Sequence, residues 1–209
     1  MSEAVAENLK NLIIKGQEVV EDDWLVLRLA EPVEGAPAID PATVAVPEGK
    51  IIVPQSVWLV QRELLAARAA AGEIGVWVAS DERPEELKED LSKFAVIAVD
   101  FPKFTDGRGY SIAYNLRVRL GWTGELRAIG DVLRDQLFQM RRVGFDAYAT
   151  RPDRNIHDAL KGLSDFSETY QASVDQKLPL FRRHTRNVGN VGVGADAAGQ
   201  AVNNDGAGI

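Results

Sequence analysis

Short apolar runs alternate with helix-like segments through the middle of this chain, and this alternation limits the folds it can adopt. Strand-like runs occupy residues 74–79, 94–99, 125–129 and 145–149. The first two are apolar on both faces, as in the buried strands of a parallel sheet. Strands that alternate with helices predict a parallel sheet with right-handed crossovers. We therefore expect an α/β fold of successive βα units, either an open sheet or a partial barrel.

Helical periodicity fills the intervals between these runs. Helices are predicted at residues 55–71, 81–91, 109–120 and 131–143, and within residues 156–172. In the first, three- and four-residue spacing places five apolar residues along one face, namely Val57, Val60, Leu64, Ala67 and Ala71. In the second, Pro84 is suited to a first helical turn. In the third and fourth, helical spacing predicts burial of Ile112, Ala113, Leu116, Leu120, Leu133, Leu137 and Met140.

The two ends of the chain differ from its middle. Apolar runs at residues 12–14 and 24–29, separated by an acidic turn, predict strands of a small β element. Prolines then indicate a loop-rich connection, and from Asn187 onward the chain has almost no large side chains. We therefore predict an N-terminal β element with its linker (1–50), an α/β domain (51–186) and a disordered tail (187–209).

Composition excludes several classes of function. The 209 residues include no cysteine, which removes disulfides, thiolate nucleophiles and cysteine-ligated zinc or iron–sulfur clusters. No apolar run approaches the roughly 20 residues that span a bilayer. The acidic first residues lack the basic-then-apolar order of a signal peptide. We therefore expect a cytoplasmic protein without a membrane partner.

The charge distribution favours a small anionic ligand. A net charge of -7 argues against a general nucleic-acid binder. Residues 1–93 carry 9 basic and 18 acidic side chains, whereas residues 94–154 carry 10 basic and 7 acidic ones. Most of this local basic excess is arginine, which suits bidentate contact with oxyanions. For most of these arginines, however, we favour the simpler interpretation that they coat two helices. We also expect a homodimer, because several arginine-bearing helices would not all face water.

Ligands of parallel α/β sheets bind outside the carboxyl ends of the strands. The residues of interest therefore follow Val99, Ile129 and Ala149, in three loops. The predicted ligand-binding residues in these loops are Lys103, Thr105, Asp106, Gly107, Arg108, Gly109, Tyr110, Ser111 and Arg151.

The first loop is long for a connection between a strand and a helix, and such loops are often functional. Backbone amides near Gly109 to Ser111, with Arg108 beside them, would form an anion site at the start of the helix. The alternative is a turn in which Thr105 and Asp106 satisfy the backbone and the glycines permit positive φ. Local sequence does not separate these interpretations.

Two aspartates are the candidates for acid–base catalysis. Asp100 stands at a strand end where no helix begins immediately, although stabilising a turn is the commoner role of such a residue. Asp131 opens a predicted helix, so N-capping, worth about 1 kcal/mol, is the main alternative to a general base. The histidines lack metal-ligand spacing, so we predict no metal site, and the cofactor stays undefined.

A dense set of residues resembles a known bacterial family. The matching residues are 101–113, Leu116, Arg117, Gly121, Trp122, 124–128, 130–132, 135–137 and 144–146. They closely resemble domain of unknown function family 934, most densely over about residues 94–151. The resemblance implies a probable oxidoreductase involved in sulfite reduction, because family members accompany assimilatory sulfite reductase in bacterial genomes. It also implies sulfite reductase as a partner.

Two hypotheses follow. Without cysteine, the chain is not the sirohaem and iron–sulfur subunit of a sulfite reductase. The first hypothesis is therefore an accessory protein of assimilatory sulfite reduction, which binds an anionic ligand or the reductase through its strand-end loops. The second is an oxidoreductase that borrows a nicotinamide or flavin cofactor, with Asp100 or Asp131 as acid or base and Lys103, Arg108 and Arg151 holding the anion.

Overall fold

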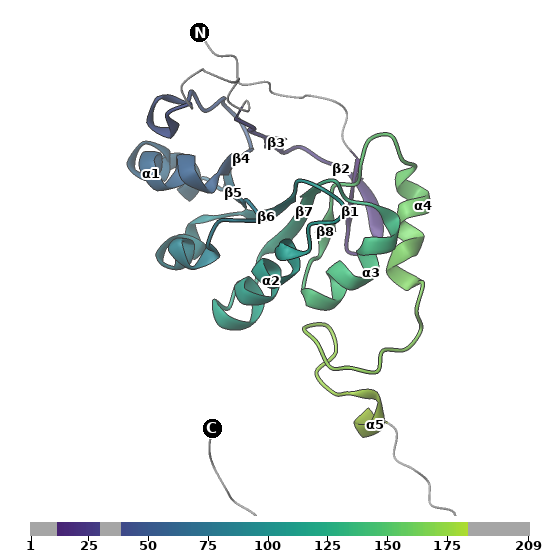
Figure 1. The fold of residues 1–209 in the computed structure, drawn as a ribbon. Helices are drawn as coiled ribbons and strands as arrows, with labels where there is room; N and C mark the ends of the chain where they lie inside the picture. Colours follow the sequence, from purple (N-terminus) through teal and green to yellow (C-terminus); the bar gives the residue numbers. More distant parts are fainter. Residues whose placement is uncertain (1–11, 30–38, 184–209) are drawn as a thin grey trace, which may run out of the picture.

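The computed structural model describes residues 12–29 and 39–183, so the predicted tail at 187–209 lies outside the described residues. One sheet holds eight strands in the order β2-β1-β8-β7-β6-β5-β4-β3 (Figure 1). The strands are β1 (Leu12–Lys15), β2 (Glu18–Glu21), β3 (Leu25–Val26), β4 (Ile51–Pro54), β5 (Ile74–Val78), β6 (Val96–Phe101), β7 (Glu125–Gly130) and β8 (Ala147–Tyr148). Neighbouring strands from β3 to β8 are parallel, and β1 is antiparallel to both β2 and β8. The predicted α/β fold class is confirmed.

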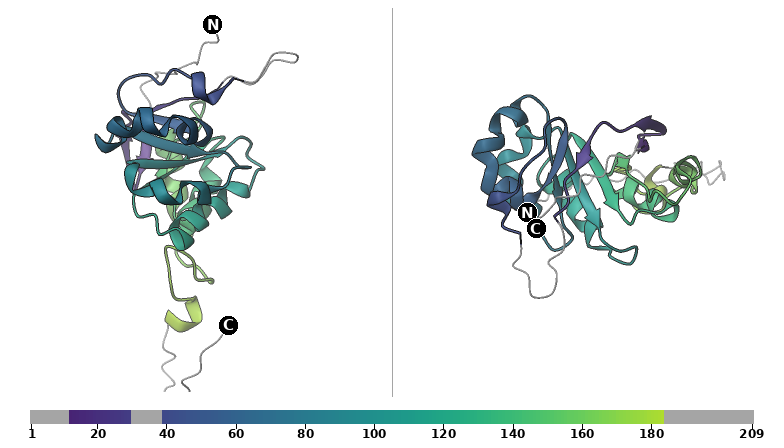
Figure 2. Two further views of the ribbon diagram at one scale, coloured as in Figure 1. Left: turned by 90° about the vertical axis from the view of Figure 1, so that its left-hand side faces the viewer. Right: turned by 90° about the horizontal axis from the view of Figure 1, so that it is seen from above.

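The helical segments follow the predicted order but differ at their ends. They are η1 (Pro41–Thr43), α1 (Gln55–Ala70), η2 (Pro84–Lys93), α2 (Arg108–Tyr114), η3 (Asn115–Arg119), α3 (Arg134–Val143), α4 (Ile156–Lys161), η4 (Gly162–Ser164) and α5 (Leu180–Arg183). Here η1, η2 and η4 are 3-10 helices, and η3 is a π-helical continuation of α2. Figure 2 shows α5 at the end of a segment that extends away from the sheet and its helices. In the described ranges, no helix is both long and apolar enough to cross a bilayer.

A short connection forces the sheet to curl. β2 and β3 lie at opposite edges of the sheet, yet only residues 22–24 join them in sequence. Four Cα steps from Glu21 to Leu25 reach about 14 Å at most, whereas seven strand spacings in a flat sheet measure about 34 Å. The edges must therefore approach each other, and the sheet is an open, curled half-barrel rather than a flat one.

The curl gives the sheet an outer and an inner face with separate cores. Consecutive parallel strands with crossovers of one hand carry their helices on one face. Leu126 and Ala128 of β7 accordingly pack in the larger core, with Leu137 and Met140 of α3. The inner face has a second, smaller core of Ile52, Val96, Ala98 and Ile129, with Trp24, Val26, Trp77, Ala95 and Ala149 packed against it.

Of the five apolar residues on the predicted face of α1, only Val57 is buried. Val60 is 59% exposed and Leu64 is 78% exposed, and Ala67 and Ala71 are exposed too. The face that packs inward consists of Gln55, Val57, Trp58, Gln61, Leu65 and Ala69. Its polar members are buried because they are bonded: Gln61 donates to the carbonyls of Pro41 and Val44, and Trp58 donates to Asp90. Helix α1 therefore has an inward face and a second, apolar face toward solvent.

Candidate functional site

Asp131 joins the three loops at the carboxyl ends of β6, β7 and β8, which we call the carboxyl-end rim (residues 102–107, 131–133 and 149–155). One carboxylate oxygen accepts from the backbone N–H of Phe104 at 2.8 Å. The other accepts from Arg151 Nη1 at 3.1 Å. The strand-end rule therefore selected three loops that do meet. The N-capping interpretation of Asp131 is wrong, because α3 begins only at Arg134 and Leu133 is its N-cap.

Gln136 of α3 strengthens this junction. Sequence reasoning did not identify it as a site residue. Its carboxamide oxygen accepts from Leu133 N at 2.9 Å, which bridges back over the start of α3. Its amide nitrogen donates to the carbonyl of Phe104 at 3.2 Å. Phe104 is therefore held through both backbone groups, by Asp131 and by Gln136.

Arg151 is shared between two aspartates. Besides Asp131 it binds Asp153, with Nε and Nη2 each 2.9 Å from a carboxylate oxygen. This fork keeps the pKa of Asp153 below its usual value, and the hydrogen bonds from Asp153 and then Asp131 raise the pKa of Arg151. Arg151 is therefore oriented by its neighbours, and an incoming anion would compete with Asp153 for it.

The first loop has the turn in which Asp106 satisfies the backbone, but the expected positive φ of its glycines is wrong, because neither Gly107 nor Gly109 has one. Asp106 accepts from the backbone N–H of Arg108 at 3.1 Å and from its guanidinium Nη2 at 2.6 Å. The Arg108 guanidinium holds the pKa of Asp106 well below its usual range. Gly107 is the N-cap of α2. A Cβ on Gly109 would lie 2.6 Å from the ring of Phe101, so that glycine permits close packing.

The remaining predicted residues of this loop vary in exposure. Lys103, Thr105 and Ser111 are exposed, and no described carboxylate pairs with Lys103. Tyr110 is half-buried against Phe101, with ring centroids 5.5 Å apart. Burial and then the charge of Asp135 raise the pKa of Tyr110.

Asp100 lies inside β6 rather than in a loop, on the inner face of the half-barrel. It is 7% exposed and accepts from Arg28 Nη2 at 2.7 Å. The Arg28 guanidinium also lies over the ring of Trp77, 5.3 Å from its centroid. Trp77 in turn donates to the carbonyl of Leu27 at 2.9 Å. Sequence reasoning missed both residues: Trp77 lies on β5, which pairs with β6, and the curl of the sheet brings Arg28 to Asp100 from beyond β3.

A cavity of about 450 Å³ opens beside the third loop. Its lining residues are Val132, Leu133, Arg134, Asp135, Thr150, Asp153, Arg154, Asn155, Asp158 and Ala159. Arg134 is bound by Asp158 and Asp165 at 3.2 and 3.0 Å. The side chain of Arg154 is 64% exposed, and its one ion pair with a described residue is a 3.5 Å contact with Asp153. The cavity therefore offers one weakly held cation among several acceptors.

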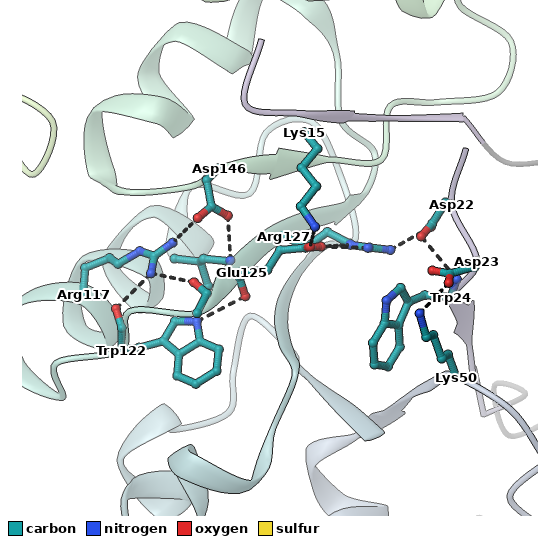
Figure 3. Close-up of polar contacts among 12 residues, drawn as sticks. Lys15, Asp22, Asp23, Trp24, Lys50, Arg117, Trp122, Glu125, Arg127 and Asp146 are labelled. Atoms are coloured by element: carbon teal, nitrogen blue, oxygen red, sulfur yellow. Dashed lines mark hydrogen bonds and ion pairs between the residues drawn. The ribbon is translucent and has the colours of Figure 1, made fainter. Parts of the chain in front are cut away.

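A second polar network occupies the opposite, amino-end rim of the half-barrel (Figure 3). Arg127 of β7 is 2% exposed and binds Asp22 and Glu125, each at 2.7 Å. Lys15 adds a 2.8 Å contact to Glu125. The network continues to Arg117, which donates to the carbonyls of Trp122, Gly124 and Gly144. Its signal in the sequence was an arginine inside an otherwise buried strand.

This amino-end network joins the N-terminal connection to the sheet, because Asp22 belongs to the segment between β2 and β3. In barrel folds the amino-end face serves stability, and ligands bind at the carboxyl ends. In the described part of the chain, no group of three or more His, Asp or Glu side chains is arranged to hold a metal ion. The carboxyl-end rim with its cavity is therefore the candidate functional site.

Comparison with protein families places this site within a known group. A family model described as a bacterial protein of unknown function (DUF934) matches residues 75–181. The chain belongs to this family. No curated protein and no solved structure matches the chain.

The DUF934 match begins within β5 and ends within α5. It therefore includes the whole carboxyl-end rim and every residue that lines the cavity. It also includes Glu125 and Arg127, but Asp22 and Arg28 lie before it. The DUF934 region thus contains the candidate site, and the N-terminal segment supplies two residues that complete the inner face.

Proposed function

We propose that the chain is an accessory protein of assimilatory sulfite reduction, and that it binds an organic anionic group at the carboxyl-end rim. The observation that carries the proposal is the cavity of about 450 Å³ between the second and third strand-end loops, next to the residues through which Asp131 binds Phe104 and Arg151. Open α/β sheets and barrels bind ligands at this end. The link to sulfite reduction rests on the resemblance to family 934.

The size and lining of the cavity favour an organic anion over a single oxyanion. One water molecule occupies roughly 30 Å³ of liquid, so sulfite alone would fill a small part of this space. Ligand cavities of roughly 300–1,000 Å³ hold small organic molecules. Arg154 is suited to an anionic group, and the exposed carboxylate of Asp135 to a hydroxyl or amine donor on the same ligand. The ligand class is therefore an organic anion with hydrogen-bond donors, free or carried by the reductase.

The acid–base alternative has less geometric support. Asp100 and Asp131 each accept a hydrogen bond from a guanidinium group, from Arg28 and Arg151 respectively. A catalytic acid or base needs a reacting group within hydrogen-bond reach. Carboxylates already engaged in this way are better suited to orienting arginines than to transferring protons. Binding is therefore the function that the geometry favours.

The proposal predicts an interaction with the sulfite reductase holoenzyme of the same bacterium. Adding the chain should produce measurable binding by calorimetry, a change in the rate of sulfide formation, or both. The double substitution Arg151→Gln, Arg154→Gln should weaken binding or the rate effect roughly 10- to 100-fold, since hydrogen bonds to charged groups contribute about 1.5–3 kcal/mol.

Arg119→Gln provides the matched control, because Arg119 is exposed on η3, which leads to the amino end of β7. This variant should behave as the unmodified chain. Neither binding nor a rate change with the unmodified chain would overturn the proposal. Equal loss in the Arg119 and rim variants would show that net charge, rather than the rim, carries the interaction.

A further inference from the structure

The segment that follows η4, which we call the C-terminal arm (residues 165–183), exposes large apolar side chains. Phe166, Tyr170, Leu178 and Phe181 are 62%, 64%, 50% and 63% exposed. Figures 1 and 2 show the arm extending away from the sheet and ending in α5, far from α1. The ring of Phe166 lies 4.8 Å from that of Phe138 on α3, but all four side chains stay at least half exposed.

The arm is nevertheless held at its base. Arg142, on the buried side of α3, donates to Asp175 at 2.8 Å and to the hydroxyl of Thr169 at 3.2 Å. Ser173 donates to the carbonyl of Arg142 at 2.6 Å. Within the arm, the rings of Tyr170 and Phe181 lie 6.4 Å apart. The exposed apolar surface is thus presented in a defined conformation.

The area and composition of this surface suit a protein interface. At about 60% exposure, three aromatic side chains present roughly 100 Å² each, and Leu178 brings the summed exposed area along the arm to about 400 Å². A standard interface buries about 800 Å² per partner, of which somewhat more than half, about 450 Å², is apolar. Exposed aromatic side chains next to arginine are also the composition of interface hot spots. The arm alone supplies the apolar share of a standard interface.

The charges of the arm indicate the occupant. Its acidic side chains are paired, with Asp165, Glu168 and Asp175 bound to Arg134, Arg183 and Arg142. The three basic and three acidic side chains of the arm balance in number, but among the described residues Lys177 and Arg182 are left without a carboxylate. On α1 of a second copy, the exposed Glu63 offers the complementary charge.

The solvent face of α1 provides the surface to receive the arm. It exposes Val60 and Leu64, and its charged member is the exposed Glu63. A surface helix normally presents polar side chains to water. We propose that the arm of each copy packs against the α1 face of a second copy, in a two-fold symmetric dimer. In this dimer the arm of each copy covers the α1 face of the other, so that neither apolar surface stays open to solvent.

The mass of the full chain, measured by size-exclusion chromatography with light scattering, tests this dimer. The unmodified chain should be a dimer. Tyr170→Ser, Phe181→Ser should raise the dimer dissociation constant roughly 100-fold or more, and Val60→Ser, Leu64→Ser should do the same. All four side chains are mostly exposed, so circular dichroism and the midpoint of thermal unfolding should report a folded chain in both cases.

Mixing the two double variants provides the sharpest form of this experiment. The arm variant retains its α1 face and the α1 variant retains its arm, so an equimolar mixture should recover dimer through one intact contact. A matched control replaces Tyr114 and Val118, which are 42% and 48% exposed on another helical surface, by serine and should remain dimeric. A monomeric unmodified chain, or a dimer that survives the arm substitutions, would overturn the proposal.

Discussion

Replacement of Arg127 by methionine should lower the free energy of unfolding by roughly 3–5 kcal/mol, the usual loss when one partner of a buried ion pair is removed. The guanidinium is 2% exposed and binds carboxylates on two separate elements, Asp22 and Glu125. Methionine fills a similar volume but leaves both carboxylates buried without this cation. Because Asp22 lies between β2 and β3, the connection that curls the sheet would lose its main polar attachment to β7.

Urea unfolding at neutral pH measures this loss. The matched control is Arg108→Met, whose ion pair with Asp106 lies on the surface, with the arginine side chain 60% exposed. Solvent and salt screen such surface pairs, so the control should change stability far less than Arg127→Met does. Similar small losses in both variants would contradict the structural role assigned to Arg127.

The loss of unfolding free energy in the Arg127→Met variant should depend on pH. Burial raises the pKa of Asp22 above 3.8, although Arg127 opposes this effect. An acid whose pKa is higher in the folded chain than in the unfolded chain destabilises the fold only when it is ionised. This cost therefore disappears as the pH falls through the pKa of the folded chain to that of the unfolded chain. Removal of Arg127 should raise the pKa of Asp22 further. The deficit of the variant relative to the unmodified chain should therefore shrink between pH 7 and pH 4, and a deficit that grows would contradict this account.

Replacement of Gly130 by alanine should cost roughly 3 kcal/mol, because it combines a positive φ with steric overlap. Gly130 ends β7 with φ +92°. A Cβ there would lie 2.4 Å from the carbonyl oxygen of Phe101 and 2.7 Å from a carboxylate oxygen of Asp100. Backbone and a salt-bridged carboxylate must both shift, which would also displace Asp131 and the rim.

The matched control for this change is Gly121→Ala. Gly121 has φ +72°, but a Cβ there would meet nothing within 4 Å. It should therefore cost only the backbone term of about 1 kcal/mol. Thermal and urea unfolding of the two variants separate the contributions. Equal losses of unfolding free energy in the two variants would show that the positive φ alone accounts for the cost. The steric overlap of a Cβ at position 130 with Phe101 and Asp100 would then contribute nothing.

The parallel sheet could be predicted from the sequence, but its curl could not. Alternation of apolar strands with helical segments determines the order of the elements between β4 and β8. The curl depends on β3 joining the edge beyond β4 while β2 joins the opposite edge. Short apolar runs do not indicate which strands they will pair with, because pairing is decided by tertiary packing.

Helix α1 illustrates a second limit. Its sequence contains two apolar faces, and periodicity alone identified the one that includes Leu64. The face that is actually buried contains Gln61, whose amide bonds to the connection before β4. A buried glutamine with its hydrogen bonds satisfied has no local signal, because its partners lie elsewhere in the chain.

The candidate site was predicted in part. The strand-end rule found Asp131 and Arg151, which the structure brings together. It also led to the loop that lines the cavity. The partner of Asp100 was missed, because Arg28 lies 72 positions away in the sequence. The role of Asp106 was open and is now explained by its bonds to Arg108.

Growth of a deletion strain on defined sulfur sources tests the central claim most directly. The strain should fail to grow on sulfate and on sulfite and should grow on sulfide, which places the chain at the sulfite step. The unmodified chain should restore growth on sulfate, whereas the Arg151→Gln, Arg154→Gln variant, expressed at the same level, should not. Normal growth of the deletion strain on sulfate, or full rescue by the rim variant, would contradict the account.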